Sequence, residues 1–191
     1  MSGVHQLTTH GEQTGFDDVL GDIRTALTGA SQWLETQVGA TGFILPHLQA
    51  GQNDYFQFKI QFPHRKVLGT AIASLHLHVI PSVANTGKVK YQYAYCWVNV
   101  GDAIPLIGNW AGTTIEVDVD AADVLKHKLH SIVTNITLPN ETYSSILLIK
   151  VTRLSQGQGA DTYTGNIGLL YMDAHITVGQ FGSKFELSDT E

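Results

Sequence analysis

Cysteine, methionine and charge are scarce in this chain of 191 residues. Its single cysteine, Cys96, excludes an internal disulfide. Charged residues make up only 15%, and a formal net charge of -6 argues against a nucleic-acid surface, which needs a basic patch. No apolar run approaches the ~20 residues of a membrane-spanning helix, and residues 1–15 lack the apolar segment of a signal peptide. We therefore expect a soluble protein, made in a cytoplasm, without nucleic-acid or membrane partners.

What the chain does contain is glycine, at 19 positions, together with a period-two alternation of apolar and polar residues. This alternation is typical of strands with one buried face. The predicted strands span residues 55–62, 72–80, 89–100, 113–119, 129–138, 145–154 and 169–178. No crossover helix recurs between them, so the pattern predicts a mainly β fold, an antiparallel β-sandwich or jelly roll, over residues 41–191.

The N-terminal region has a different pattern. Residues 1–15 are polar without apolar periodicity, and we expect a flexible arm there. Apolar residues then recur at helical spacing, with two aspartates in the first turn and Gly29 as a stop. The stripe consists of Phe16, Val19, Leu20, Ile23 and Leu27. These features predict a short amphipathic helix within a helical segment at residues 16–40, packed on the β-domain.

A polar pair recurs in two of the predicted strands. His76 and His78 alternate with apolar residues and share one face, and Asp173 and His175 do the same near the C-terminus. The opposite faces comprise Leu75, Leu77 and Val79 in the first strand and Leu170, Met172, Ala174, Ile176 and Val178 in the second. We interpret the four polar residues as one seam, which either is hydrogen-bonded or lies at a subunit interface. The alternative is a metal site of the kind that cupins and double-stranded β-helix oxygenases build, although we predict no cofactor.

An aromatic row lies on one face of the strand at residues 89–100. It consists of Tyr91, Tyr93, Tyr95 and Trp97. Such a row serves as core, as a subunit contact or as a stripe on which sugars stack. Cys96 lies between two of these aromatics, where a small buried hydrophobe is expected. No pattern for nucleophilic catalysis or phosphate binding is present, so the sequence predicts a protein that is not an enzyme.

Seven blocks in fixed order resemble a group of virion structural proteins of tailed bacteriophages. The blocks are residues 75–78, 91–99, 126–127, 144–147, 161–165, 169–175 and 182–184, and the resemblance runs from about Asp17 to the C-terminus. The chain has Val79 and Lys184 where those relatives have an aromatic residue and an arginine.

The resemblance implies a structural role on a phage particle, with no catalytic residues. Our first hypothesis is a protein that decorates or cements the capsid through subunit contacts, with the major capsid protein or other virion proteins as partners. It would assemble as a homo-oligomer, a dimer or trimer, on the capsid surface. The second hypothesis is a head- or tail-fibre domain that binds host glycans through the tyrosine row. The third is a metal-dependent, cupin-like enzyme centred on His76, His78, Asp173 and His175.

Overall fold

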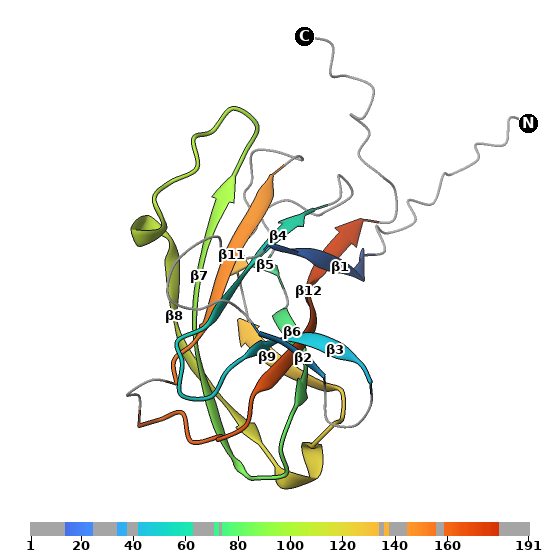
Figure 1. The fold of residues 1–191 in the computed structure, drawn as a ribbon. Helices are drawn as coiled ribbons and strands as arrows, with labels where there is room; N and C mark the ends of the chain where they lie inside the picture. The colour runs from blue at the N-terminus through green and yellow to red at the C-terminus, as the bar shows by residue number, and fades with distance from the viewer. Residues whose placement is uncertain are drawn as a thin grey trace, which may run out of the picture.

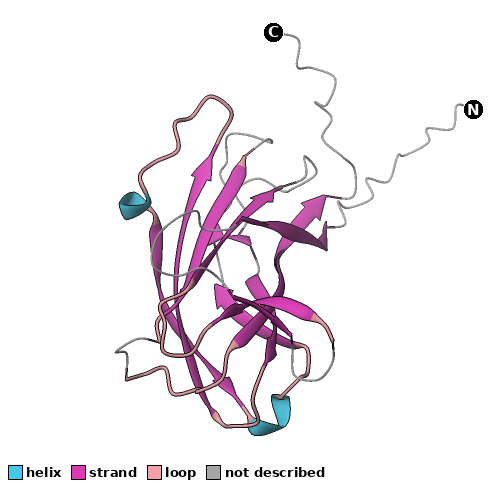
Figure 2. Ribbon diagram, viewed as in Figure 1, coloured by secondary structure: helices cyan, strands magenta, loops and turns pink. Residues whose placement is uncertain are grey.

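The computed structural model of this chain consists almost entirely of β-strands (Figures 1 and 2). It describes residues 14–24, 34–37, 42–62, 71–72, 74–133, 136–137, 145–155 and 159–179. Within these ranges the helices are two short 3-10 turns, η1 (Ile107–Asn109) and η2 (Ala121–Asp123). No helix in the described part of the chain has the length and hydropathy to cross a membrane.

Ten strands form two antiparallel layers that share one strand. The first sheet contains β2 (Leu34–Gln37), β3 (Ile44–Leu48), β6 (Ser74–Pro81), β9 (Lys128–Val133) and β12 (Ile167–Gly179). The second contains β4 (Tyr55–Gln61), β7 (Gly87–Val98), β8 (Ala111–Val119) and β11 (Ile146–Arg153), which run side by side in Figure 1. The shared strand is β1 (Thr14–Arg24), which pairs with β12 and then with β4. The predicted antiparallel β-sandwich is therefore confirmed.

A separate two-stranded sheet is formed by β5 (Ala71–Ile72) and β10 (Ile136–Thr137). Each lies at one end of a predicted longer strand, residues 72–80 and 129–138 respectively. Residues 73, 134 and 135 fall outside the described residues. The two predicted strands are thus each represented by a long piece in the first sheet and a short piece in the small sheet.

The core lies between the two layers and follows the alternation seen in the sequence. Every second residue of β4 and β11 is fully buried, and β6 contributes the facing apolar residues. These residues are Phe56, Phe58 and Ile60, then Leu147, Ile149 and Val151, and then Leu75, Leu77 and Val79. Burying one such side chain stabilises the fold by about 1.5–3 kcal/mol. The face of each sheet that points away from this core can therefore serve a role other than core packing.

The predicted N-terminal helix is wrong, because residues 14–24 form β1 and residues 34–37 form β2. Leu20, a member of the predicted helical stripe, is 66% exposed. The apolar spacing of this segment fits a helix, but a short isolated helix is marginal in water, whereas pairing with β12 and β4 satisfies the backbone on this strand. Gly21 suits the close approach, since a Cβ there would lie 3.1 Å from the Ile60 side chain. Of the predicted arm at residues 1–15, residues 14 and 15 begin β1, and residues 1–13 lie outside the described residues.

A β-bulge corrects the predicted core face of β12. The pairing with β6 shifts register between Leu169 and Tyr171. Leu169 is buried and Leu170 only half-buried, while Met172 is fully buried again beyond the shift. A bulge adds one residue to one strand and so changes which positions face the core. Leu170 therefore does not belong to the core face that the simple alternation assigned to it.

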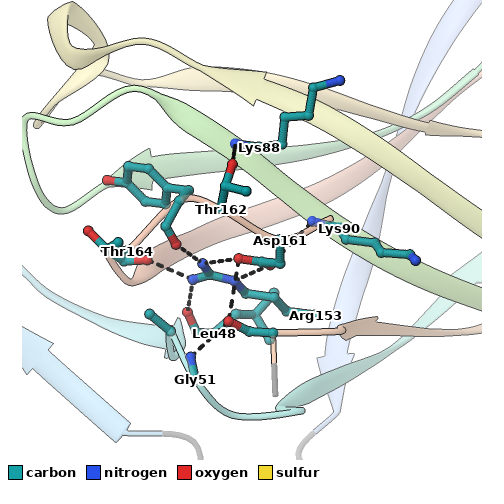
Figure 3. A network of polar contacts seen from close by, with 12 residues as sticks. Leu48, Gly51, Lys88, Lys90, Arg153, Asp161, Thr162 and Thr164 are labelled. Carbon is teal, nitrogen blue, oxygen red and sulfur yellow. Dashed lines mark hydrogen bonds and ion pairs between the residues drawn. The ribbon is translucent and has the colours of Figure 1, made fainter. Parts of the chain in front are cut away.

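A fully buried arginine fixes the segment that precedes β12 (Figure 3). Arg153 donates from Nε and Nη2 to the two carboxylate oxygens of Asp161, each at 2.9 Å. Its Nη1 donates to the carbonyl oxygens of Leu48 at 3.2 Å and Gly165 at 2.7 Å. Asp161 also accepts from the Lys90 backbone N–H at 3.2 Å. The block at residues 161–165, which contributed to the sequence resemblance, thus binds together β3, β7 and β11.

Candidate functional site

Two polar sites lie on the outer faces of the sandwich, one on each sheet. The first is the predicted His–Asp seam. Strands β6 and β12 are neighbours, with Asp173 opposite His76 and Tyr171 opposite His78. Because Leu75 and Leu77 face the core, the histidines between and beyond them face outward. The structure therefore brings together all four residues that sequence reasoning selected for this seam.

The seam converges on the Asp173 carboxylate. Its Oδ1 lies 3.4 Å from His76 Nδ1, and its Oδ2 lies 3.3 Å from His78 Nε2 and 3.5 Å from His175 Nε2. One ligand atom from each of His76, Asp173 and His175 can be chosen so that all lie within 4.8 Å of one another. Three imidazoles thus surround one carboxylate.

Because the seam is buried, any polar atom in it that lacks a hydrogen-bond partner costs free energy. His76 is 7% exposed and Asp173 is 4% exposed. Among the described residues, His76 Nδ1, His78 Nε2 and Asp173 Oδ1 have no partner at hydrogen-bond geometry. Burial lowers the pKa of His76 below its ordinary 6.5; the charge of Asp173 opposes this shift, and His175 and His78 reinforce it. The neutral imidazole of His76 is thereby favoured.

A further histidine extends the seam at the His78 end. His78 Nδ1 lies 2.7 Å from His127 Nε2, so one ring nitrogen is engaged with His127 while the other points to Asp173. The His78 ring also stacks on Tyr171, with centroids 4.0 Å apart. These contacts fix the orientation of His78. His127 belongs to a block of the sequence resemblance, but sequence reasoning did not place it beside the seam.

The aromatic row of β7 does not form one exposed stripe. Tyr91 is fully buried, and its hydroxyl lies 2.8 Å from Nδ1 of the buried His130 on β9. Tyr93, Tyr95 and Trp97 are half-buried and pack against the core. The rings of Tyr93 and Tyr95 stack on one another at 6.5 Å. Tyr91 therefore serves as core and as a link between the two sheets.

Cys96 lies on the other face of β7 and is buried. Burial raises the pKa of its thiol. A thiol with a raised pKa is a poor nucleophile at neutral pH, in agreement with the expectation of a small buried hydrophobe.

The second site is a groove on the outer face of the second sheet, which sequence reasoning missed. It has two adjoining lobes. One lobe, of about 370 Å³, is lined by Gln57, Phe58, Lys59, Trp110, Leu148 and Ile149. The other, of about 200 Å³, is lined by Gln92, Ala94, Ile107, Lys150 and Thr152. Most of the lining side chains are the outward members of β4, β7 and β11, opposite the core residues of the same strands. We refer to these two lobes together as the outer groove.

The connection between β7 and β8 supplies the aromatic wall of the outer groove. This connection, residues 99–110, extends beyond the ends of the strands in Figure 1 and includes η1. Trp110 is half-buried, and its indole N–H donates to the Pro105 carbonyl oxygen at 3.0 Å. On the sheet itself, the Lys150 ammonium lies 3.9 Å from the centre of the Tyr55 ring, and burial lowers the pKa of Lys150. The groove thus combines aromatic rings, amides and cations.

No protein-family model and no curated protein match this sequence. Two solved structures have a fold similar to that of this chain. One is TmCBM61, a carbohydrate-binding module in complex with beta-1,4-galactotriose, at 12% identity and a TM-score of 0.30, with 72% of this chain and 70% of that chain covered. The other comes from work on the promiscuous specificity of carbohydrate-binding modules of the β-sandwich superfamily, at 12% identity and a TM-score of 0.27, with 91% of this chain and 58% of that chain covered. Likenesses this weak carry no functional argument.

Proposed function

We propose that this chain is a non-catalytic recognition domain of a tailed-phage fibre that binds a host glycan in the outer groove. The observation that carries the proposal is the outer groove itself: a recess on a rigid sheet, with Trp110 at one side and a row of amide and ammonium groups across its floor. The larger lobe, about 370 Å³, falls within the roughly 300–1,000 Å³ of small-ligand sites. The virion setting is supported by the ordered sequence blocks.

The chemistry of the outer groove suits a polyhydroxylated ligand. Gln57 and Gln92 each offer both a donor and an acceptor, as paired sugar hydroxyls require. Lys59 and Lys150 add donors only, which also favours a glycan with acidic groups. Aromatic side chains such as Trp110 provide the apolar surface on which the face of a sugar ring packs. Because the two glutamines and the two lysines lie on strands, the positions of these polar groups are set before the ligand arrives.

A glycan array probed with the full chain, followed by calorimetric titration of the best glycan, tests this proposal. Trp110→Ala should reduce affinity by at least about tenfold, the cost of about 1.4 kcal/mol of lost contact. Tyr93→Ala, an aromatic truncation on the core side of the same sheet, is the matched control and should leave the affinity within about twofold of wild type if the variant is folded. A silent array, or equal losses in the two variants, would refute the proposal.

A second candidate function, decoration of a virion surface, is favoured by a different observation. The connection between β7 and β8 exposes large apolar side chains, with Val100 83% exposed and Leu106 80% exposed. Ile104 and Ile107, in the same connection, are also exposed. Clustered exposed apolar side chains are typical of protein–protein contact sites. The occupant would be a virion protein such as the major capsid protein, or a second copy of this chain.

Capsid binding by a double variant, Ile104→Ser with Leu106→Ser, tests the second candidate. The variant should lose occupancy on undecorated phage capsids relative to wild type, while its glycan binding stays the same. Deletion of residues 1–13 in a parallel protein tests the predicted arm. Full occupancy by both altered proteins would dismiss the decoration role.

A further inference from the structure

From the seam we infer a binding site for one divalent transition-metal ion, of which Zn²⁺ is the prime example, with His76, Asp173 and His175 as ligands and His78 as a neighbouring fourth donor. This site lies on the outer face of the first sheet, whereas the outer groove lies on the second. It therefore goes beyond the proposed function and does not depend on it. The donors, imidazoles with one carboxylate, are those that zinc and other divalent first-row ions take in proteins.

The spacing of the donor atoms fits a metal better than it fits hydrogen bonds. The three distances from Asp173 oxygens to histidine nitrogens are 3.4, 3.3 and 3.5 Å. Good N–H···O hydrogen bonds lie at about 2.7–3.2 Å, and those to a charged carboxylate are shorter still. Ligands bound to zinc at about 2.0–2.1 Å in a tetrahedron stand about 3.3–3.4 Å apart. The carboxylate–histidine distances are thus close to the spacing of zinc ligands, and the donor atoms of His76, Asp173 and His175, which lie within 4.8 Å of one another, would draw together around an ion.

Three buried atoms of the seam lack a hydrogen-bond partner among the described residues. His76 Nδ1, His78 Nε2 and Asp173 Oδ1 are buried, and within the described residues none makes a hydrogen bond. Leaving one buried polar atom unpaired costs about 1–3 kcal/mol, so three such atoms at one carboxylate and its neighbouring histidines need a common explanation. A cation held by His76 and Asp173 would satisfy two of these atoms, and His78 Nε2 would be satisfied as the fourth ligand.

The residues around the seam resemble those that orient the ligands of a metal site. A metal-ligating histidine commonly uses its second ring nitrogen in a hydrogen bond that fixes its orientation. His78 does this with His127, at 2.7 Å. The His175 side chain is 35% exposed, so an ion has a route from solvent. The ion would bind β6 to β12, two strands that are far apart in sequence.

Metal binding by the full chain is the test. The protein is stripped with EDTA and titrated by calorimetry with Zn²⁺, and in parallel with Co²⁺, whose visible absorption reports direct coordination. We expect a single site, a higher melting temperature with Zn²⁺, and an absorption band with Co²⁺. Wild-type protein that shows none of these would overturn the inference, and so would binding that is equally tight in the seam variants below.

Variants separate a ligand from a merely structural residue. Asp173→Asn and His175→Gln should each weaken Zn²⁺ binding by more than about 100-fold and abolish the Co²⁺ band, whereas His127→Gln, one shell further out, should cost about 10–100-fold. His130→Gln, which changes a histidine whose ring contacts the buried Tyr91 hydroxyl, is the control for histidine content. If a variant fails to fold, the wild-type titrations still decide the question. Glycan binding measured with EDTA shows independently whether the proposed function holds.

Discussion

Arg153 and Asp161 form a two-point ion pair, with both nitrogen–oxygen distances at 2.9 Å, in a place where neither side chain is more than 1% exposed. Desolvating two charges is costly, and the pair is stable here because the guanidinium also donates to backbone carbonyl oxygens of β3 and of the segment before β12. The pair is therefore a structural anchor and not a reactive centre.

Breaking this pair should be strongly destabilising. Asp161→Asn leaves a buried guanidinium without its counter-charge, and we expect the free energy of unfolding to fall by about 3–5 kcal/mol. Urea denaturation measures the change. Lys88→Ala is the matched control, since the Lys88 ammonium is half-exposed and lies 3.6 Å from Glu116 and 3.8 Å from Asp118; it should cost less than about 1 kcal/mol. Similar losses in both variants would contradict this account.

The buried His130, which contacts Tyr91, should make the free energy of unfolding depend on pH. Burial, with a smaller contribution from the Lys128 charge, lowers the pKa of His130 to about 4 from its ordinary 6.5. Between these values the unfolded chain binds a proton that the folded chain does not, so the free energy of unfolding falls as pH drops from about 6.5 to about 4. The His130 contribution is roughly 3 kcal/mol at most.

Thermal denaturation across this pH range measures the effect. His130→Gln should be less stable at pH 7 but should lose less stability on acidification than the wild type does. Tyr91→Phe removes the 2.8 Å contact with the Tyr91 hydroxyl but keeps the imidazole, so its pH dependence should remain. An unchanged pH slope in His130→Gln would rule out this assignment.

Gly112 allows β8 to pack closely against β7. A Cβ at this position would lie 2.0 Å from the Tyr93 carbonyl oxygen, which the backbone cannot accommodate without moving. We expect Gly112→Ala to destabilise the fold by about 1–3 kcal/mol or more. Gly108→Ala is the control, because a Cβ there meets nothing within 4 Å, and surface changes of this kind stay within about 0.5 kcal/mol. Equal melting temperatures for the two variants would show that β8 lies further away.

The exposed apolar side chains of the connection between β7 and β8 should cause the chain to self-associate. If Leu106 and its neighbours contact a second copy of the chain, light scattering should show oligomers that grow with protein concentration. The double variant Ile104→Ser with Leu106→Ser should then remain a monomer at the same concentrations. A wild-type protein that is monomeric at all concentrations would leave a virion protein as the partner of this surface, and homo-oligomerisation through it would be excluded.

Strands with one buried face could be predicted from sequence because their own residues carry the signal. In β4, Phe56, Phe58 and Ile60 alternate with Gln57 and Lys59, and no helix can bury such a set on one side. The seam followed from the same rule, since Asp173 and His76 each share a face with another polar residue two positions away. What the alternation could not supply was the register that puts these two residues opposite each other.

Sequence reasoning missed the features that depend on the pairing of strands in the folded chain. Residues 16–23 have apolar spacing that fits a helix, and only the partners β12 and β4 make the segment a strand. The bulge at Leu170 likewise arises from pairing. Trp110 gave no periodic signal because it belongs to a connection that folds onto the sheet. The ion pair had a weaker signal that could have been used: an arginine that ends an apolar strand, eight residues before an aspartate.

Mapping the bound glycan on the full chain by NMR decides whether the outer groove is the binding site. Backbone amide shifts are followed by NMR while the best glycan from the array is added to saturation. We expect the changes to centre on the outer groove, at Gln57, Lys59, Trp110 and Lys150, and we expect Trp110→Ala to abolish them. Changes confined to Tyr93, Tyr95 and Trp97 on the core side of β7, or to the seam, would contradict it.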